Sequence, residues 1–413
     1  MRLARRELIA ALGAATLVGC ARRDDGAVSI WAIDVEGENL KEILPAYVRG
    51  GGGRVDNQWL SWTAAHEKLL TAYVGDALPD VFQLSNGWLS EFATIGALAP
   101  VPDAAPFSAP RFAGSDPAHF GGRPVAVPWV VDVAVQYHRR DLLAAAGYER
   151  MPLALDAWRA MLRRVKARGV ADYAILMQLN WPDHLIRLGA QTGTPLLRDR
   201  EARGNFQDPD FRAMLGVYRS LFDEGLAPLV TSTEVPDPSA ELARGWAAIY
   251  PAGAWIGADL RRRRLLPDDA WGVAPTPGIA GPARTVVAGS SLAVAAHARH
   301  PERAWELVRY LTAPATAVRF HRIARNLPAV RAAWDEPPLA TDPLLRVFRG
   351  ELARATPMPG VLEWSRITTE IQLVAELMVR GRLDIDAAAA EMDRRADAIL
   401  AKRRWLLDRG RLS

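Results

Sequence analysis

The chain has one cysteine among its 413 residues, which excludes a disulfide framework and a zinc site built from several cysteines. Its seven histidines include no H-E-x-x-H pair. Neither a G-x-x-x-x-G-K-[ST] loop nor a G-x-S-x-G elbow occurs, which argues against a phosphate-cradling loop and a serine hydrolase. We therefore predict no catalytic residue, no metal and no cofactor.

The net charge of the chain is also small. The chain carries 51 basic and 47 acidic side chains, a formal net charge of +4, which is too small to predict binding to nucleic acid or to a bare membrane surface. Half of the residues are hydrophobic, so the chain can bury a large core. A chain of this length corresponds to two or three domains or to one large two-lobed unit.

The N-terminal segment has the features of an export signal. Basic residues precede an apolar stretch at 8–18, which is far shorter than the roughly 20 residues that cross a bilayer. We therefore predict that residues 1–19 are a signal peptide. The string LVGC at 17–20 resembles the bacterial lipobox, in which Cys20 would be lipid-modified. An unmodified mature protein is the alternative, and Arg5-Arg6 leaves both the general and the twin-arginine route open.

Strands and helices are predicted to alternate after the leader. Apolar and β-branched patterns indicate strands at 28–33, 54–60 and 79–84, and helices are indicated at 38–48 and 87–95. A further helix is expected to begin between the second and third strands. This order predicts βαβ units and a mainly parallel sheet.

A long β-type run at 125–137 and a proline- and glycine-rich segment at 273–282 are predicted to cross between two α/β lobes. Each lobe, a mainly parallel sheet flanked by helices, is then discontinuous in sequence. We expect the lobes to comprise residues 20–131 plus 275–325, and residues 132–274 plus 326–413. A cleft between two such lobes is a favoured place for a ligand.

Tryptophan is the unusual residue of the composition, with 14 copies against 10 phenylalanines and 8 tyrosines. A flat indole ring suits a sugar, whose C–H face packs on it while amides and carboxylates bond the hydroxyls. Burial in the core is the competing interpretation. The tryptophans at predicted loops or strand ends are Trp62, Trp88, Trp129, Trp181, Trp255 and Trp364.

Asp34, Glu36 and Glu38 follow the first predicted strand. A glycosidase could use two such carboxylates as acid and base. We favour a role as acceptors for ligand hydroxyls or as negative charges at a helix start.

Several strings, taken in order, carry a resemblance to a known family. They are Trp31–Glu38, Trp62–Leu70, Leu78–Trp88, Val127–Asp132, Tyr137–Gly147, Trp246–Trp255, Gly289–Val294, Pro301–Leu311 and Asn326–Pro328. Through them the chain resembles the family 1 extracellular solute-binding proteins, the carbohydrate receptors of bacterial ABC importers, over almost its whole length. The resemblance implies the type II periplasmic-binding-protein fold and a receptor, not an enzyme. Such a receptor closes on a mono- or oligosaccharide and delivers it to a membrane permease, and we expect a monomer.

The resemblance also implies ligand-binding residues at matching positions. They are Glu36, Asn86, Trp129, Asp132, Trp255, Gly289, Ser290, Asn326 and Trp364. Trp129 and Trp255 would stack on the sugar, and Glu36 would accept its hydroxyl protons. Ser85-Asn86-Gly87 departs from the Gly-Asn-Thr expected there, so the contact made by Asn86 is the least defined.

Two alternatives stay open. One is a receptor for a non-sugar solute such as glycerol phosphate, which would need arginines or helix N-termini in the cleft. The other is a cell-envelope glycosidase that uses Glu36 or Asp132. In each case the predicted location is the periplasm or the outer face of the cytoplasmic membrane, with the chain anchored through Cys20.

Overall fold

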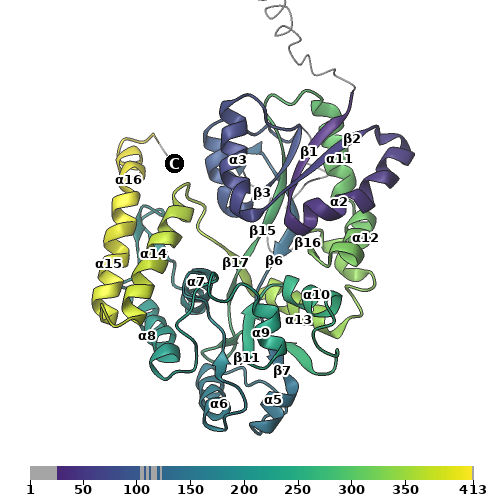
Figure 1. The fold of residues 1–413 in the computed structure, drawn as a ribbon. Coiled ribbons are helices and arrows are strands. Elements are labelled where there is room, and N and C mark those ends of the chain that lie inside the picture. The colour runs from purple at the N-terminus through teal and green to yellow at the C-terminus, as the bar shows by residue number, and fades with distance from the viewer. Residues whose placement is uncertain (1–25, 103–106, 108–110, 113–118, 121–122, 412–413) are drawn as a thin grey trace, which may run out of the picture.

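The computed structural model of the chain describes residues 26–102, 107, 111–112, 119–120 and 123–411. The predicted signal peptide and the lipidation candidate Cys20 lie outside these residues. Figure 1 shows two lobes, each with a sheet and flanking helices, joined by extended segments near the middle of the molecule. Among the described residues, no helix has both the length and the apolar character needed to cross a membrane.

A seven-stranded mixed sheet forms the first lobe. Its strands, in spatial order, are β16 (Leu327–Pro328), β6 (Val127–Asp132), β15 (Thr285–Val294), β3 (Val81–Ser85), β1 (Val28–Ile33) and β2 (Val55–Leu60), with β17 (Ala355–Pro357) beside β15. β1 pairs in parallel with β2 and β3, as the βαβ pattern predicts. β15 pairs antiparallel with β3 and β6. The sheet is therefore less parallel than predicted, because β15 returns from the other lobe and runs opposite to β3 and β6, although it is parallel to β17.

Helices flank this sheet (Figure 1). They are α2 (Asp34–Tyr47), α3 (Trp62–Val74), α4 (Leu89–Thr94), α11 (Pro301–Leu311) and α12 (Pro314–Ala324). α11 has the predicted bounds, with proline at its first position, where the missing N–H is not needed. α2 begins earlier than predicted, directly at the end of β1, so Asp34 and Glu36 lie in its first turn. Negative charge is favourable there because the helix dipole is positive at that end.

A smaller, four-stranded sheet forms the second lobe. Its order is β12 (Trp271–Ala274), β7 (Val135–Arg139), β11 (Ala247–Ala252) and β8 (Tyr173–Ile175). Here β7 pairs antiparallel with both neighbours, and β11 and β8 are parallel. The helices of this part are α5 (Arg140–Ala145), α6 (Leu155–Ala167), α7 (Asp183–Ala190), α8 (Pro209–Asp223), α9 (Pro238–Ala243), α10 (Trp255–Arg262), α13 (Pro343–Arg354), α14 (Trp364–Val379), α15 (Ile385–Ile399) and α16 (Ala401–Asp408).

The predicted β-type run at 125–137 does connect the two sheets. β6 ends at Asp132 in the first sheet, and β7 begins at Val135 in the second. The chain crosses back between β12 and β15, and crosses again after β16. The lobe boundaries given above stay predictions.

Candidate functional site

Carboxylates gather where strands β1 and β6 end, on the side of the first lobe that meets the second. Burial, together with the negative charges of Asp132 and Asp34, raises the pKa of Glu36 to about 7. Burial likewise raises the pKa of Asp132 to about 6. β6 runs in the same direction as β1, because β15 is antiparallel to both β3 and β6 and β3 is parallel to β1. The two strands therefore end at the same edge of the sheet, where Glu36 follows β1 and Asp132 ends β6. The predicted residues Glu36 and Asp132 therefore share one site.

The second lobe supplies the other side of this site. Arg187 of α7 lowers the pKa of Asp132, whereas the nearby carboxylate of Asp183 raises it. The backbone N–H of Ala254 donates a hydrogen bond to Asp132. Only glycine fits at position 253, because a Cβ there would lie 2.2 Å from Oδ1 of Asp132. The loop before α10 is thus fixed against the last residue of β6.

Three exposed indole rings flank these carboxylates. Trp255 is the first residue of α10 and is 42% exposed, and its ring meets Tyr250 edge-on at 6.2 Å. Trp62, at the start of α3, is 40% exposed, and its backbone N–H donates to Oδ2 of Asp34. Trp181, just before α7 and two positions from Asp183, is 39% exposed. Aromatic rings from both lobes therefore stand beside the acidic cluster.

Neither Trp62 nor Trp181 was among the predicted ligand-binding residues. Both belong to the tryptophans at predicted loops or strand ends. The signal that would have identified them is position: each stands at the start of a helix that follows a strand end, as Trp255 does. Such positions lie on the rim of the interlobe region in this fold.

Two of the tryptophans predicted to bind the ligand are buried instead. Trp129 is 3% exposed and stacks on Phe320, with ring centroids 5.2 Å apart and an interplanar angle of 9°. Trp364 is also 3% exposed, and its indole Nε1 lies 3.4 Å from the sulfur of Met358. Both rings belong to the core of the molecule, so their predicted contact with a ligand stays a prediction.

Asn86, directly after β3, and Ser290, on β15, were predicted to bind the ligand and each bonds a residue of the neighbouring segment. Gln83 donates through Nε2 to the hydroxyl of Ser290 at 2.7 Å, and Ser290 is 1% exposed. Ser291 donates to Oδ1 of Asn86 at 2.9 Å. Gly289 has φ +134°, and a Cβ there would lie 2.3 Å from the carbonyl oxygen of Val130. This network fixes the end of the sheet beneath the carboxylates.

Asn326 lies further away along the chain, at the third crossing. Its backbone carbonyl accepts a hydrogen bond from Nδ1 of His321, and its buried Oδ1 has no partner among the described residues. The structure thus groups Glu36, Asp132 and Trp255 most clearly. No cluster of three or more His, Cys, Asp or Glu side chains in the described part of the chain is placed to hold a metal.

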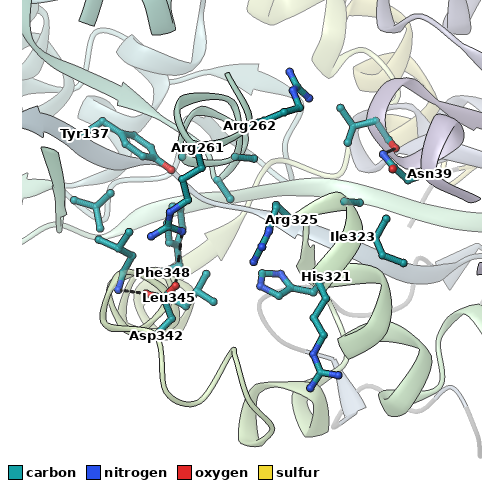
Figure 2. A pocket seen from close by; sticks show the side chains of 18 of the residues that line it. Asn39, Tyr137, Arg261, Arg262, His321, Ile323, Arg325, Asp342, Leu345 and Phe348 are labelled. Atoms are coloured by element: carbon teal, nitrogen blue, oxygen red, sulfur yellow. Dashed lines mark hydrogen bonds and ion pairs between the residues drawn. The ribbon is translucent and has the colours of Figure 1, made fainter. Parts of the chain in front are cut away.

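A cavity of about 450 Å³ adjoins the acidic cluster (Figure 2). Its walls come from α2 and α12 of the first lobe and from α10, α13, β7 and β12 on the other side. Val35 and Ala254 line it, and each is a direct neighbour of a predicted site residue. None of the nine predicted ligand-binding residues, all of which are described, lines this cavity itself. The lobes also touch elsewhere, where Ser90 donates to the carbonyl oxygen of Gly360 at 2.9 Å.

Known proteins with the same architecture have been characterised. The structure of the sugar-binding protein MalE from Xanthomonas citri is similar to this chain, with 38% sequence identity and a TM-score of 0.84, covering 92% of this chain and 99% of that one. The GacH receptor of Streptomyces glaucescens has a TM-score of 0.79 at 20% identity and covers 91% of this chain and 98% of its own. These similarities confirm the predicted two-lobed α/β fold.

Sequence comparison agrees. The diacetylchitobiose binding protein DasA of Streptomyces coelicolor is 24% identical over 330 residues, which are 74% of this chain and 77% of that protein. The family model described as "Bacterial extracellular solute-binding protein" matches residues 33–318. The predicted family is thereby confirmed: the chain belongs to the bacterial extracellular solute-binding proteins.

Proposed function

We propose that this protein captures a mono- or oligosaccharide between its lobes and delivers it to the permease of an ABC importer. The observation that carries the proposal is the pairing of exposed indole rings from both lobes, Trp62 and Trp255, with Asp34, Glu36 and Asp132. Indole faces pack on the C–H face of a sugar, and carboxylates accept its hydroxyl protons. The similarity to sugar-binding relatives supports the same ligand class.

The two-lobed shape of the molecule provides a mechanism for delivering the solute to the permease. A ligand that touches both lobes binds the arrangement in which the lobes are close, and its binding free energy shifts the population toward that arrangement. The three crossings between the sheets are the natural places for the change in angle. The permease would then recognise surfaces of both lobes that become aligned.

We further propose that Cys20 carries the lipid anchor and that the monomer works outside the cytoplasm. A single receptor chain tethered beside its permease raises the local concentration of delivered solute. Mass spectrometry of the protein extracted from membranes tests this proposal. A diacylated N-terminal Cys20 is expected, and an unmodified N-terminus would contradict it.

A glycosidase is the second candidate, because the raised pKa of Glu36 would suit a general acid near neutral pH. A receptor returns its ligand unchanged, so the two candidates differ in a simple assay. The protein is incubated with maltose, maltotriose and diacetylchitobiose, and reducing ends are measured together with thermal unfolding. We expect a rise in Tm with at least one sugar and no new reducing ends. New reducing ends would establish the glycosidase, and no Tm shift with any sugar would contradict the proposed receptor.

A further inference from the structure

The cavity beside the acidic cluster is unusually rich in arginine. It lies between α2 and α12 on one side and α10 and α13 on the other, so both lobes contribute to its wall. Ionisable side chains on this wall are Glu38, Arg261, Arg262, His321, Arg322, Arg325 and Asp342. Four guanidinium groups therefore face two carboxylates.

Both carboxylates already have partners. Asp342 accepts the backbone N–H of Leu344 at 2.8 Å, which caps α13, and its other oxygen lies 3.8 Å from Nη1 of Arg261. Glu38 lies on the exposed edge, where it pairs with Lys41 at 3.7 Å. The acids on the wall thus neutralise few of its arginines.

Two further arginines of the wall are bonded to groups outside it. Arg262 donates to Oδ1 of Asp259 at 2.6 Å. Arg322 donates to the carbonyl oxygen of Pro337 at 2.8 Å. The Asp259 carboxylate thus neutralises Arg262, and Arg261 pairs with Asp268 at 3.2 Å as well as with Asp342. Arg322 bonds only a carbonyl, so its positive charge is not neutralised by this contact.

Arg325 differs from these arginines because its guanidinium makes no hydrogen bond or ion pair with any residue that the structure describes. Figure 2 shows its side chain in the middle of the cavity, next to His321 and facing Arg261. It terminates α12 with φ +58°, a left-handed conformation in which glycine is usual at a helix end.

His321 provides a second, independent sign of a ligand. The ring is 2% exposed and lines the cavity. Its Nδ1 is bonded to the carbonyl oxygen of Asn326, so Nδ1 carries the proton and Nε2 presents a lone pair. This buried Nε2 has no partner within the described part of the chain. A buried polar atom of this kind is normally satisfied, by the protein or by a bound group.

We propose that this cavity binds a small oxyanion, a phosphate or a carboxylate with a neighbouring hydroxyl group, held by Arg325 and Arg261 with the hydroxyl donating to Nε2 of His321. A guanidinium binds such groups through two parallel charge-assisted hydrogen bonds. The cavity volume admits a small organic anion as well as free phosphate. The site is distinct from the sugar contacts, because it contains none of the indole rings or carboxylates assigned to them.

Binding at this place has a consequence for the whole receptor. Arg325 ends a helix of the first lobe, whereas Arg261 belongs to α10, the helix that begins with Trp255. An anion that bridges them favours the present arrangement of the lobes over a more open one. Any solute that needs the same arrangement then binds more tightly, since the coupling is reciprocal.

The test is calorimetric titration of the purified full chain with sodium phosphate at constant ionic strength. The variant is Arg325→Gly, which removes the guanidinium while glycine suits the left-handed backbone, so folding is preserved. Arg200→Gly is the matched control, because Arg200 is exposed and also has φ +58° but lies in the loop before β10 (Arg203–Gly204), away from the cavity. We expect saturable binding by the wild type and by the control, and at least tenfold weaker binding by Arg325→Gly. Equal affinity in Arg325→Gly, or no saturable binding by the wild type, would overturn the proposal.

Two further titrations separate the sources of the anion. If phosphate still binds in the presence of saturating maltose, the ligand of the cavity is a free anion. If glycerol 3-phosphate competes with maltose, the ligand is an acidic group on the transported solute. Either result supports the proposed site. Trp255→Ala keeps the two proposals apart. If it weakens sugar binding and leaves phosphate binding intact, both proposals stand. Phosphate binding by a wild type that binds no sugar would contradict the proposed function alone.

Discussion

Gly253 lies so close to Asp132 that a side chain at residue 253 would collide with it: a Cβ on Gly253 would lie 2.2 Å from the Asp132 carboxylate. Asp132 ends a strand of the first sheet, and Gly253 follows a strand of the second. The contact therefore joins the two sheets at the base of the candidate site.

Gly253→Ala is expected to displace the Asp132 carboxylate and to reduce sugar affinity more than stability. Overpacking at such a site costs about 1–3 kcal/mol, measured as the free energy of unfolding by denaturant titration. Gly216→Ala in α8 is the control, because a Cβ there makes an ordinary 3.6 Å contact with Ile385. The control is expected to be neutral or slightly stabilising. Unchanged sugar affinity in Gly253→Ala would separate Asp132 from the ligand.

Trp255→Ala should weaken sugar binding by about 1–3 kcal/mol, since burial of an indole face against a ligand contributes about that much. The folded state should lose little stability, because the ring is 42% exposed. Calorimetry with the sugar that shifts Tm gives the affinity.

Trp405→Ala is the matched control for that measurement. Trp405 is 45% exposed on α16, where Arg409 lies over its ring at 4.3 Å, and it is remote from the site. Its removal should leave the affinity unchanged. An equal loss of affinity in both variants would mean that Trp255 acts through general stability.

Trp129→Ala is expected to act on stability instead. The ring is buried and stacked on Phe320, and truncation of such a core residue costs about 3–5 kcal/mol. Thermal and denaturant unfolding measure the loss. A variant that keeps its unfolding free energy but loses sugar affinity would restore the predicted direct contact of Trp129 with the ligand.

The raised pKa of Glu36 makes a prediction about pH. Its folded-state pKa of about 7 lies above the ordinary value of 4.5, so the folded protein binds the extra proton between these values. The contribution of Glu36 to stability is fully present below pH 4.5 and is lost as the pH rises through about 7. Glu36→Gln should therefore leave Tm nearly unchanged at pH 5 and raise it at pH 8.

Glu38→Gln is the control for this pH series, because Glu38 is an exposed residue two positions along the same helix. Its effect on Tm should be the same at both pH values. If Glu36→Gln also shifts Tm equally at pH 5 and pH 8, the pKa of Glu36 is not raised in the folded protein.

Much of the architecture could be predicted from local patterns. Pro301 indicated the start of α11, and the β-type run at 125–137 indicated a crossing between the lobes. The alternation of strands and helices predicted the parallel part of the first sheet. These features depend on residues a few positions apart in the chain, so the sequence carries them directly. The antiparallel return of β15 depends on the path through the other lobe and has no local signal.

The composition and order of the sequence alone determined the family, the two-lobed α/β class and the presence of many indole rings. Only the tertiary structure decided which of those rings face solvent: Trp255 at the start of α10 does, while Trp129 is covered by Phe320 and Trp364 lies in the core. The same holds for the neighbouring carboxylates of Glu36 and Asp132, and for the guanidinium of Arg325, which bonds none of the residues that the structure describes. Burial and charge proximity arise from contacts between distant segments, which no local spacing of residues encodes.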